Sequence, residues 1–335
     1  MSAPSTSFFG RLLASPPPPV AIEISARRVS VVALSSQGGS RTVTGQSSEL
    51  LPDGAVTPAL NAPNVHDGGA LASAIRSAVE RITPRPKRAA LLLPDTVAKV
   101  SLIRFDKVPA KAQDLEQLIR WQVRKAAPFR IEDAQVSWID GAVATDGGRE
   151  YLVLVARRDI VDSYERACEA AGIHAGLVDI VSTNQVNAVL ATDPSASSGD
   201  WLLVHTAPDY STIIVVRNGR AIFFRNRPAD GLPHDMGDLV HQTAMYYEDR
   251  LGGTSFSRVV LAGSSNFEPA HAERGRRQIE ERLGVRVETL DVRTGVTLRD
   301  RIAAGPEVLD ALAPAAGVLL RDLTPPSSRG RERVA

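Results

Sequence analysis

Cysteine, aromatic residues and long apolar runs are all scarce in this chain of 335 residues. Cys168 is its only cysteine, which excludes a disulfide framework and a metal site built from cysteines. No apolar run approaches the roughly 18 residues needed to span a bilayer, and the N-terminus lacks the apolar core of a signal peptide. The formal net charge of +1 provides no overall field that would attract nucleic acid. We therefore expect a cytoplasmic protein with no nucleic-acid partner.

Both ends of the chain are predicted to be disordered tails. Residues 1–19 contain no acidic residue and end in four prolines. Their one apolar cluster, FFGRLL, is either inert or touches a partner or a membrane surface. Residues 323–335 form the second tail. Between the tails, strand hairpins followed by helices occur twice, which predicts an α/β architecture of two related halves, one at 20–190 and one at 200–322.

Each half opens with a predicted β-hairpin. VAIEIS and VSVVAL flank Ala26–Arg28, and LLVHTAPDYSTIIVVRNG joins two apolar strands through a polar break. A phosphate-binding turn usually contains glycine, because glycine lets backbone N–H groups approach the ligand. The second turn instead holds a proline, an aspartate and a tyrosine. The pattern therefore raises the question of whether such a turn still binds a nucleotide.

Four stretches of the chain resemble the actin-like PilM proteins of type IV pilus assembly, which are relatives of the cell-division protein FtsA. They are AIEISARRVSVVAL, IRWQVRKAAPFRIEDAQVSW, VLVARRDIVDSYERACEAAGIHAGLVDI and RVVLAGSS. The resemblance covers about residues 8–322 and implies an actin-like (ribonuclease H-like) two-domain α/β fold around a cleft. It also implies a small α+β subdomain inserted in the first domain at about residues 100–180. Because 228–257 leave room for little more than one helix, we expect a reduced helical subdomain in the second domain.

The resemblance also places three phosphate loops, and the chain departs from the family's residues in each. Other side chains replace most of the family's glycines, a serine replaces the phosphate-binding lysine, and a glutamate and a histidine replace two aspartates. The candidate cofactor-binding residues are Glu23, Ser25 and Ser30 in the first loop, His205, Ala207 and Asp209 in the second, and Gly263, Ser264 and Ser265 in the third.

These replacements disfavour nucleotide binding. Loss of the lysine removes a charge-assisted hydrogen bond of roughly 1.5–3 kcal/mol. Asp209 adds a carboxylate that repels a phosphate oxygen at ~4 Å by about 1 kcal/mol in water and about 4 kcal/mol at an effective dielectric constant of about 20. Arg27 and Arg28 either compensate in part or form an exposed hairpin tip. We therefore expect a pseudo-ATPase with no catalytic residue, no metal and no cofactor.

The resemblance implies a role in assembly. Members of the family hold the cytoplasmic tail of PilN, a bitopic inner-membrane protein, between the two subdomains of the first domain, where an extended peptide can add to a strand edge. We expect a scaffold peripheral to the inner membrane through a PilN-like partner, with the motor ATPase and further copies of the chain as other candidate partners. Type IV pilus and type II secretion systems are equally compatible.

Two alternative functions stay open from the sequence. The first is an actin-like ATPase with diverged phosphate loops, in which ATP is the cofactor and Glu23 holds Mg²⁺. The missing glycines argue against it. The second is a division-type filament protein tethered to a membrane. FFGRLL is too short for the amphipathic helix that this function needs.

Other constellations have structural interpretations beside the functional ones. His234, Asp238 and His241 have the spacing of a metal site on one helix face, although Pro233 and Asp235 also suit the first turn of a helix. Cys168 is expected to be a buried small apolar residue.

A cluster of apolar side chains follows the predicted helix at 115–123. Trp121, Pro128 and Phe129 are predicted to pack in a core, or else to line a groove for a partner peptide.

Overall fold

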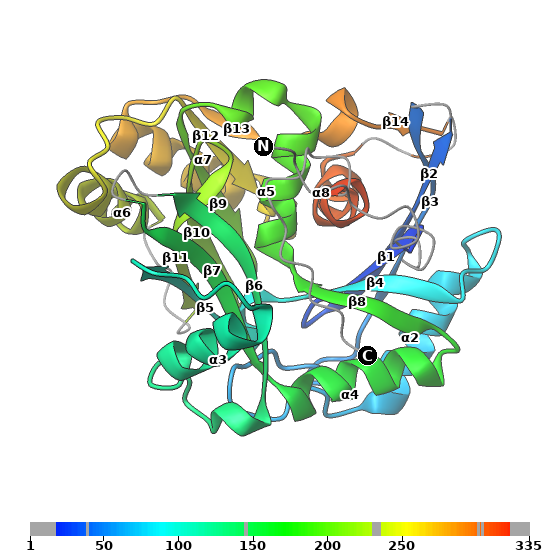
Figure 1. Ribbon diagram of the computed structural model, residues 1–335. Coiled ribbons are helices and arrows are strands. Elements are labelled where there is room, and N and C mark those ends of the chain that lie inside the picture. Colours follow the sequence, from blue (N-terminus) through cyan, green and yellow to red (C-terminus); the bar gives the residue numbers. More distant parts are fainter. Residues whose placement is uncertain are drawn as a thin grey trace.

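The computed structural model describes residues 18–37, 40–143, 147–229, 236–299, 302 and 305–321. The tails predicted at 1–19 and 323–335, with the FFGRLL cluster, lie outside these ranges apart from Pro18 and Pro19. Two sheets with a pair of helices between them form the body of the protein, and further helices cover the outer face of each sheet (Figure 1). This arrangement agrees with the predicted two-domain α/β fold.

The first sheet has six strands in the order β14-β3-β2-β1-β4-β8. The predicted first hairpin is confirmed, since β1 and β2 are antiparallel and Glu23 lies opposite Ser30. Helices α2 and α4 pack on the outer face through residues such as Ile75 and Tyr164. The bounds are β1 Val20–Ile24, β2 Arg28–Gln37, β3 Ser40–Leu50, α2 Gly68–Glu80, β4 Arg88–Leu93, α4 Arg158–Ala170, β8 His174–Ile180 and β14 Thr297–Leu298.

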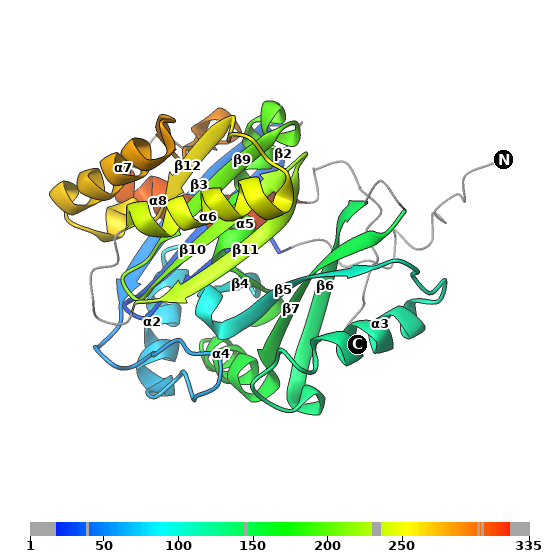
Figure 2. The same cartoon turned by 90° about the vertical axis from the view of Figure 1, so that its left-hand side faces the viewer.

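The second sheet has five strands in the order β11-β10-β9-β12-β13, with α6 and α7 on its outer face (Figure 2). The predicted second hairpin is confirmed as β9 and β10. Asn218 and Gly219 have positive φ angles of 49° and 73°, which suit the tight turn into β11. The bounds are β9 Asp200–Thr206, β10 Tyr210–Arg217, β11 Arg220–Pro228, α6 Met236–Leu251, β12 Arg258–Ala262, α7 Pro269–Leu283 and β13 Val287–Thr289.

Helices α5 (Val181–Thr192) and α8 (Pro306–Leu320) lie between the two sheets. Their side chains join the inner faces of both sheets in one core that includes Trp201. The sequence analysis did not identify α5. A helix buried on both sides has no polar stripe, so it lacks the amphipathic period by which helices are recognised.

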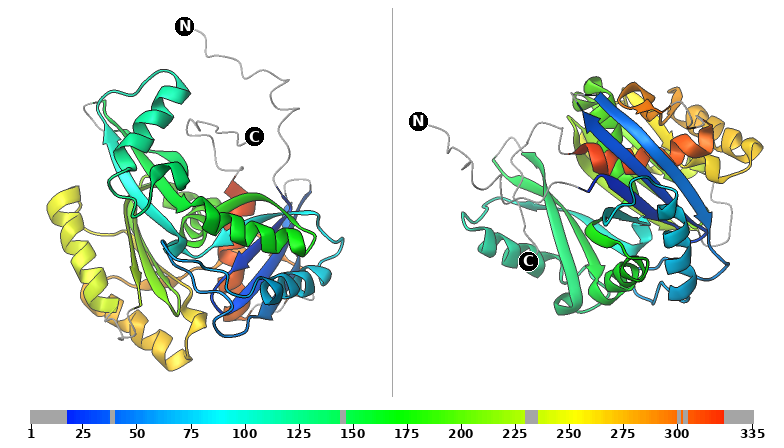
Figure 3. Two further views of the ribbon diagram at one scale, coloured as in Figure 1. Left: turned by 90° about the horizontal axis from the view of Figure 1, so that it is seen from below. Right: turned by 90° about the vertical axis from the view of Figure 1, so that its right-hand side faces the viewer.

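The subdomain inserted in the first domain is a three-stranded sheet of order β5-β7-β6 with α3 on one face, and it projects away from the first sheet (Figure 3). It ends at residue 157 and not near 180, as we had predicted. The chain after 157 returns to the first domain, because α4 packs against α2 and β8 pairs with β4. The bounds are β5 Ala98–Phe105, α3 Ala112–Val123, β6 Ala134–Val143 and β7 Arg149–Arg157.

The second domain was predicted at 200–322, but its C-terminal part, with β14 and α8, belongs to the first domain. β14 pairs in parallel with β3 of the first sheet, and α8 packs against the inner face of that sheet. The chain thus crosses back to the first domain after β13, because the apolar side of α8 is buried there. Five short 3₁₀ turns complete the fold: η1 Asp95–Val97, η2 Ile131–Asp133, η3 Pro194–Ser197, η4 Ser264–Asn266 and η5 Val292–Thr294.

The reduced helical subdomain is confirmed. Among the described residues between β11 and β12, α6 is the only helix, and it lies flat on the second sheet through Leu239, Val240 and Tyr247. In the described part of the chain, no helix has the length and apolar character to cross a membrane.

Candidate functional site

The candidate residues gather where four strands end at the interface between the two domains. Parallel strands β1 and β4 supply Glu23 and Asp95 from the first sheet. Parallel strands β9 and β12 supply His205 and Gly263 from the second sheet. The carboxyl ends of parallel strands are where α/β folds place their ligands, so the topology makes this the site to test.

Glu23 is partly buried at this interface. Its Oε2 atom is buried and has no hydrogen-bond partner among the described residues. Burial raises the pKa of Glu23 to about 7, Arg28 opposes the rise, and the carboxylates of Asp310 and Asp95 add to it. Ser30, at the position of the family's lysine, is buried opposite Glu23 and supplies no cation. Glu23 and Ser30 therefore bring negative or neutral groups to the interface, and neither supplies the positive charge of the family's lysine.

In the first turn, backbone N–H groups donate hydrogen bonds to acceptors of the turn itself. The Ser25 hydroxyl accepts hydrogen bonds from the backbone nitrogens of Arg28, at 3.1 Å, and Arg27, at 3.4 Å. The backbone nitrogen of Ser25 donates to the carbonyl oxygen of Arg28 at 2.9 Å. Arg28 also reaches across to the second domain, where its Nη2 lies 3.5 Å from Asn266 Oδ1. A phosphate here would have to displace the serine hydroxyl.

His205 is part of a buried network in the second loop. Its Nδ1 lies 3.0 Å from Gln185 Nε2, and its Nε2 lies 3.1 Å from Tyr210 Oη. Burial lowers the pKa of His205 to about 4, against the opposing effect of the Asp310 carboxylate, so the ring is neutral at pH 7. A neutral imidazole with both nitrogens engaged takes the place of the family's aspartate.

Backbone groups of the turn that follows His205 form hydrogen bonds with other backbone groups of the chain. The backbone nitrogen of Ala207 donates to the carbonyl oxygen of Tyr210 at 2.9 Å, and the Asp209 carbonyl accepts from Ala229 at 2.8 Å. Burial raises the pKa of Asp209, and the positive charge of Arg27 opposes that rise. Arg27 thus lies near a carboxylate of the chain itself, which weakens its value as a phosphate ligand.

The third loop is held by a carboxylate that the sequence analysis missed. Gly263 has a φ angle of +78°, and a Cβ atom there would lie 2.1 Å from the carbonyl oxygen of Thr206, so only glycine fits. Its backbone nitrogen donates to Asp310 Oδ1 at 3.2 Å, and that of Ser265 donates to Asp310 Oδ2 at 2.7 Å. Ser264 lies between the two donors and begins η4.

Asp95 is the second carboxylate that the sequence analysis missed. It is fully buried and accepts hydrogen bonds from the backbone nitrogen of Ser182 at 3.0 Å and from Thr212 Oγ1 at 2.6 Å. Burial raises its pKa to about 6 against these hydrogen bonds. The signal was present in the sequence, because Asp95 directly follows a strand and Asp310 is the one charged residue in the apolar run VLDALAPAAGVLL.

The backbone N–H groups of the three loops described above are already engaged within the chain. Each backbone N–H group named above donates a hydrogen bond to a serine hydroxyl, a carbonyl oxygen or an aspartate of the chain. No lysine is among the loop residues, and four carboxylates, those of Glu23, Asp95, Asp209 and Asp310, surround the place where phosphates would lie.

The residues with the spacing of a metal site fall partly outside the described ranges. His234 and Asp235 lie outside the described residues, while Asp238 is exposed and bonds to Arg282 at 2.7 Å. Within the described ranges, no cluster of histidine, cysteine and acidic residues could hold a metal ion. Cys168 is buried as predicted, and burial raises its pKa to about 12.

The prediction that Trp121 packs in a core is wrong, since 68% of its surface is exposed. Ile119 and Val123 face the core of the insertion, and helical geometry turns the residue between them outward. Phe129 does pack against that core, whereas Pro128 is exposed.

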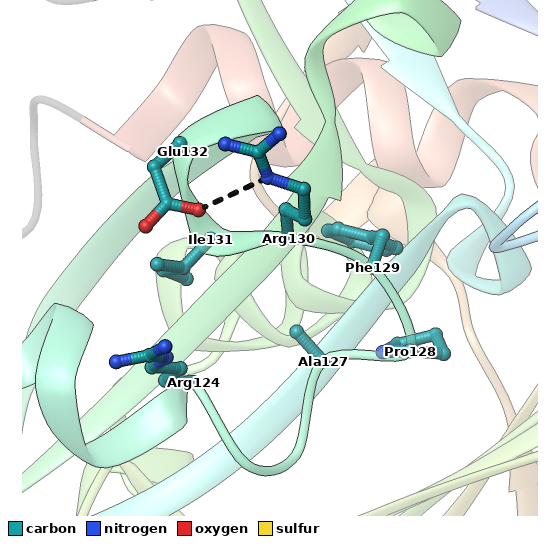
Figure 4. A pocket seen from close by; sticks show the side chains of 7 residues that line it. All are labelled: Arg124, Ala127, Pro128, Phe129, Arg130, Ile131 and Glu132. Carbon is teal, nitrogen blue, oxygen red and sulfur yellow. Dashed lines mark ion pairs between the residues drawn. The ribbon is translucent and has the colours of Figure 1, made fainter.

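A shallow pocket lies at the turn that follows α3 (Figure 4). Asn61, in the loop before α2, donates to the Pro128 carbonyl at 3.3 Å and accepts from Arg157 at 3.1 Å, so the turn meets the first domain here. An ion pair of 3.6 Å joins Arg130 and Glu132 at the rim. The pocket is lined by Arg124, Ala127, Pro128, Phe129, Arg130, Ile131 and Glu132.

Comparison with known proteins agrees with this fold. A family model described as type IV pilus assembly protein PilM matches residues 21–238, which is more than half of the chain. A solved structure described as the PilM-PilN type IV pilus biogenesis complex superimposes with a TM-score of 0.75 at 15% identity, and the match covers 91% of this chain and 98% of the other. At this identity the match shows the actin-like two-domain fold. No curated protein sequence matches the chain.

Two other structural matches are weaker. One is a Bacteroides thetaiotaomicron protein with an actin-like ATPase fold, with a TM-score of 0.48, 9% identity and coverage of 88% of this chain and 94% of the other. Another is the cytoplasmic domain of EpsL, an inner-membrane component of the type II secretion system of Vibrio cholerae, with a TM-score of 0.46, 10% identity and coverage of 92% and 95%.

Proposed function

Because the chain belongs to the family of the type IV pilus assembly protein PilM, we propose that it is a non-catalytic scaffold that binds the cytoplasmic tail of a PilN-like membrane protein. This role needs a stable surface and no phosphate chemistry. It would bring the protein to the inner membrane through its partner.

The non-catalytic part of the proposal is carried by one observation. Backbone N–H groups of the loops already donate hydrogen bonds to acceptors of the chain itself. The Ser25 hydroxyl occupies the first turn, and the Asp310 carboxylate occupies the third. Displacing a buried, charge-assisted hydrogen bond costs more than a neutral one, and a phosphate would also face the carboxylates already present. The arrangement thus disfavours ATP at both ends of the site.

The pocket at the turn after α3 supports the proposal that a PilN-like partner binds here. It lies where the insertion meets the first domain and combines an apolar floor, Phe129 and Ile131, with Arg124 on its rim. β8 ends the first sheet, and β5 and β6 end the sheet of the insertion. In the proposed complex, the backbone of an extended peptide pairs with one of these edges while a side chain enters the pocket.

Titration with a synthetic peptide tests the partner. The peptide has the sequence of the cytoplasmic tail of a PilN-like protein from the same organism, and calorimetry measures its affinity. Phe129→Ala should weaken binding at least about tenfold, since a buried aromatic anchor contributes more than about 1.4 kcal/mol. Met245→Ala, an exposed apolar residue on α6, is the matched control. Equal affinities for both variants and the unaltered protein would place the peptide elsewhere.

Titration with ATP and Mg²⁺ tests the non-catalytic part. We expect no binding at micromolar concentrations and no hydrolysis above background. Micromolar affinity that weakens in Glu23→Ala would instead establish the ATPase alternative, because Glu23 is the residue that this alternative assigns to Mg²⁺.

A further inference from the structure

Two carboxylates of the first domain bond to the second domain. Asp95, which follows β4, accepts from Thr212 Oγ1 on β10 at 2.6 Å. Asp310, on α8, accepts from the backbone nitrogens of Gly263 and Ser265 after β12 at 3.2 Å and 2.7 Å. Since β4 and α8 pack in the first domain while β10 and β12 are strands of the second sheet, both sets of bonds cross the interface.

Both carboxylates are buried, and both oxygens of each are engaged. The second oxygen of Asp95 accepts from the backbone nitrogen of Ser182, at the first turn of α5 between the domains. Thr212 is itself buried and also accepts from Asn226 Nδ2 at 2.9 Å. Loss of either carboxylate would leave buried donors without partners, so these bonds strongly favour one relative position of the two domains.

We propose that Asp95 and Asp310 are built-in ligands that hold the two domains together in place of a bound nucleotide. In the actin-like fold the nucleotide would lie between the same loops, and its phosphates would accept hydrogen bonds from both domains. Here the acceptors are side chains of the protein. The inference rests on the proposed absence of nucleotide binding, and it explains how a two-domain fold stays closed without a ligand.

The neighbouring groups agree with this role. Glu23 lies within electrostatic reach of both aspartates and has a pKa raised to about 7 by burial, so much of it is uncharged near neutral pH. An uncharged Glu23 reduces repulsion among three clustered carboxyl groups. The remaining side-chain bond described between the first turn and η4, from Arg28 to Asn266, is long at 3.5 Å and exposed. Among these loop contacts, the two aspartates therefore supply the stronger, charge-assisted hydrogen bonds.

A distance between spin labels on the two domains tests the inference. Ser73→Cys on α2 and Glu281→Cys on α7 are exposed attachment sites, and Cys168 is too buried to react. Pulsed electron paramagnetic resonance gives the distance distribution in the doubly labelled full chain. It is measured in Thr212→Val, Asp310→Asn and Asp310→Ala. The matched control is Asp67→Ala, which also removes a carboxylate that accepts from a backbone N–H, but within the first domain alone.

We expect one narrow distribution in the unaltered protein without nucleotide. Thr212→Val and Asp310→Ala should broaden it and lengthen the mean distance, with a smaller effect for Asp310→Asn, whose amide keeps one acceptor. Asp67→Ala should leave it unchanged. Thr212→Val retains the shape of the side chain, so it remains informative if an aspartate variant fails to fold. Distributions identical to that of the unaltered protein in Thr212→Val and the folded Asp310 variants would overturn the inference.

Peptide and nucleotide titrations on the same labelled proteins separate this inference from the proposed function. If the unaltered protein fails to bind the PilN-like tail, the partner proposal fails while the distance result stands. If ATP with Mg²⁺ narrows or shortens the distribution of the unaltered protein, a nucleotide closes the domains, and both the non-catalytic proposal and the built-in ligands are rejected. Unchanged distances in the variants, with no effect of ATP, reject the built-in ligands alone.

Discussion

At the scale of single residues, the interface between the domains is shaped by buried acidic groups. Glu23 and Asp95 both have pKa values raised by burial, to about 7 and about 6. Asp95 offsets the cost with two hydrogen bonds, whereas Glu23 Oε2 has none in the part of the chain that the structure describes. Glu23 is therefore the residue at which charge should cost most stability.

Glu23→Gln should stabilise the protein at high pH. Between pH 4.5 and 7 the folded protein retains a proton on Glu23 that the unfolded chain releases, so the stability contributed by this group falls as pH rises through its folded pKa of about 7. Because glutamine does not titrate, the Glu23→Gln variant does not lose this stability. We expect it to exceed the unaltered protein by up to about 3 kcal/mol at pH 8 and by little at pH 4.5.

Urea denaturation of both proteins at the two pH values measures this difference. Glu268→Gln, at an exposed position, should show no such pH-dependent gain. A Glu23→Gln variant that loses more stability at pH 8 than at pH 4.5 would mean that the carboxylate makes a favourable contact when ionised.

At the scale of elements, the close packing of α5 against α8 joins the two domains. A Cβ atom on Gly317 of α8 would lie 1.7 Å from the carbonyl oxygen of Asn184 on α5, so the two backbones meet directly at this glycine. Gly275 of α7 is also inside a helix, but a Cβ atom there would meet nothing within 4 Å.

The two glycines should respond to alanine in opposite directions. Gly317→Ala should destabilise the protein by about 1–3 kcal/mol or more, because the helices must separate. Gly275→Ala should stabilise it by about 0.5–1 kcal/mol, because alanine has the better helix propensity. Thermal unfolding of both variants measures the effects. A stabilising Gly317→Ala would contradict the close helix contact.

At the scale of the whole molecule, the inserted subdomain packs as a separate layer against the body formed by the two larger sheets. Ala98 and Ala156 face each other across β5 and β7, so the chain enters and leaves the insertion at neighbouring points. One face of its sheet packs on Phe224 of β11 and Ile180, and the other packs on α3. The body and the proposed peptide pocket can therefore be tested separately.

Replacing residues 98–157 by a short glycine-serine linker should leave a folded two-sheet body that no longer binds the PilN-like tail. Stability should fall, since Phe224 and Ile180 lose their apolar cover. Circular dichroism reports the fold, and calorimetry reports peptide affinity. Retained affinity would show that the tail binds without the insertion. The Met245→Ala protein serves again as the control for peptide binding.

Much of the fold could be predicted because local signals agreed with it. The hairpin ending at Asn218-Gly219, the apolar strand before Asp95 and the amphipathic α2 have clear periods and turn residues. α5 could not be found this way, since both its sides are buried and its sequence has no polar stripe. The return of β14 and α8 to the first sheet depends on contacts between residues far apart in the chain, which periodicity does not report.

The sequence by itself determined the two hairpins, because turn chemistry and strand patterns are local properties. Its resemblance to a known family implied the actin-like class and the replacement of glycine and lysine in the phosphate loops. Only the tertiary structure decided what occupies those loops. Asp95 and Asp310 reach the domain interface from segments more than 200 residues apart. A carboxylate becomes an acceptor for a distant loop only after the chain has folded, because hydrogen bonding depends on distance and burial in space.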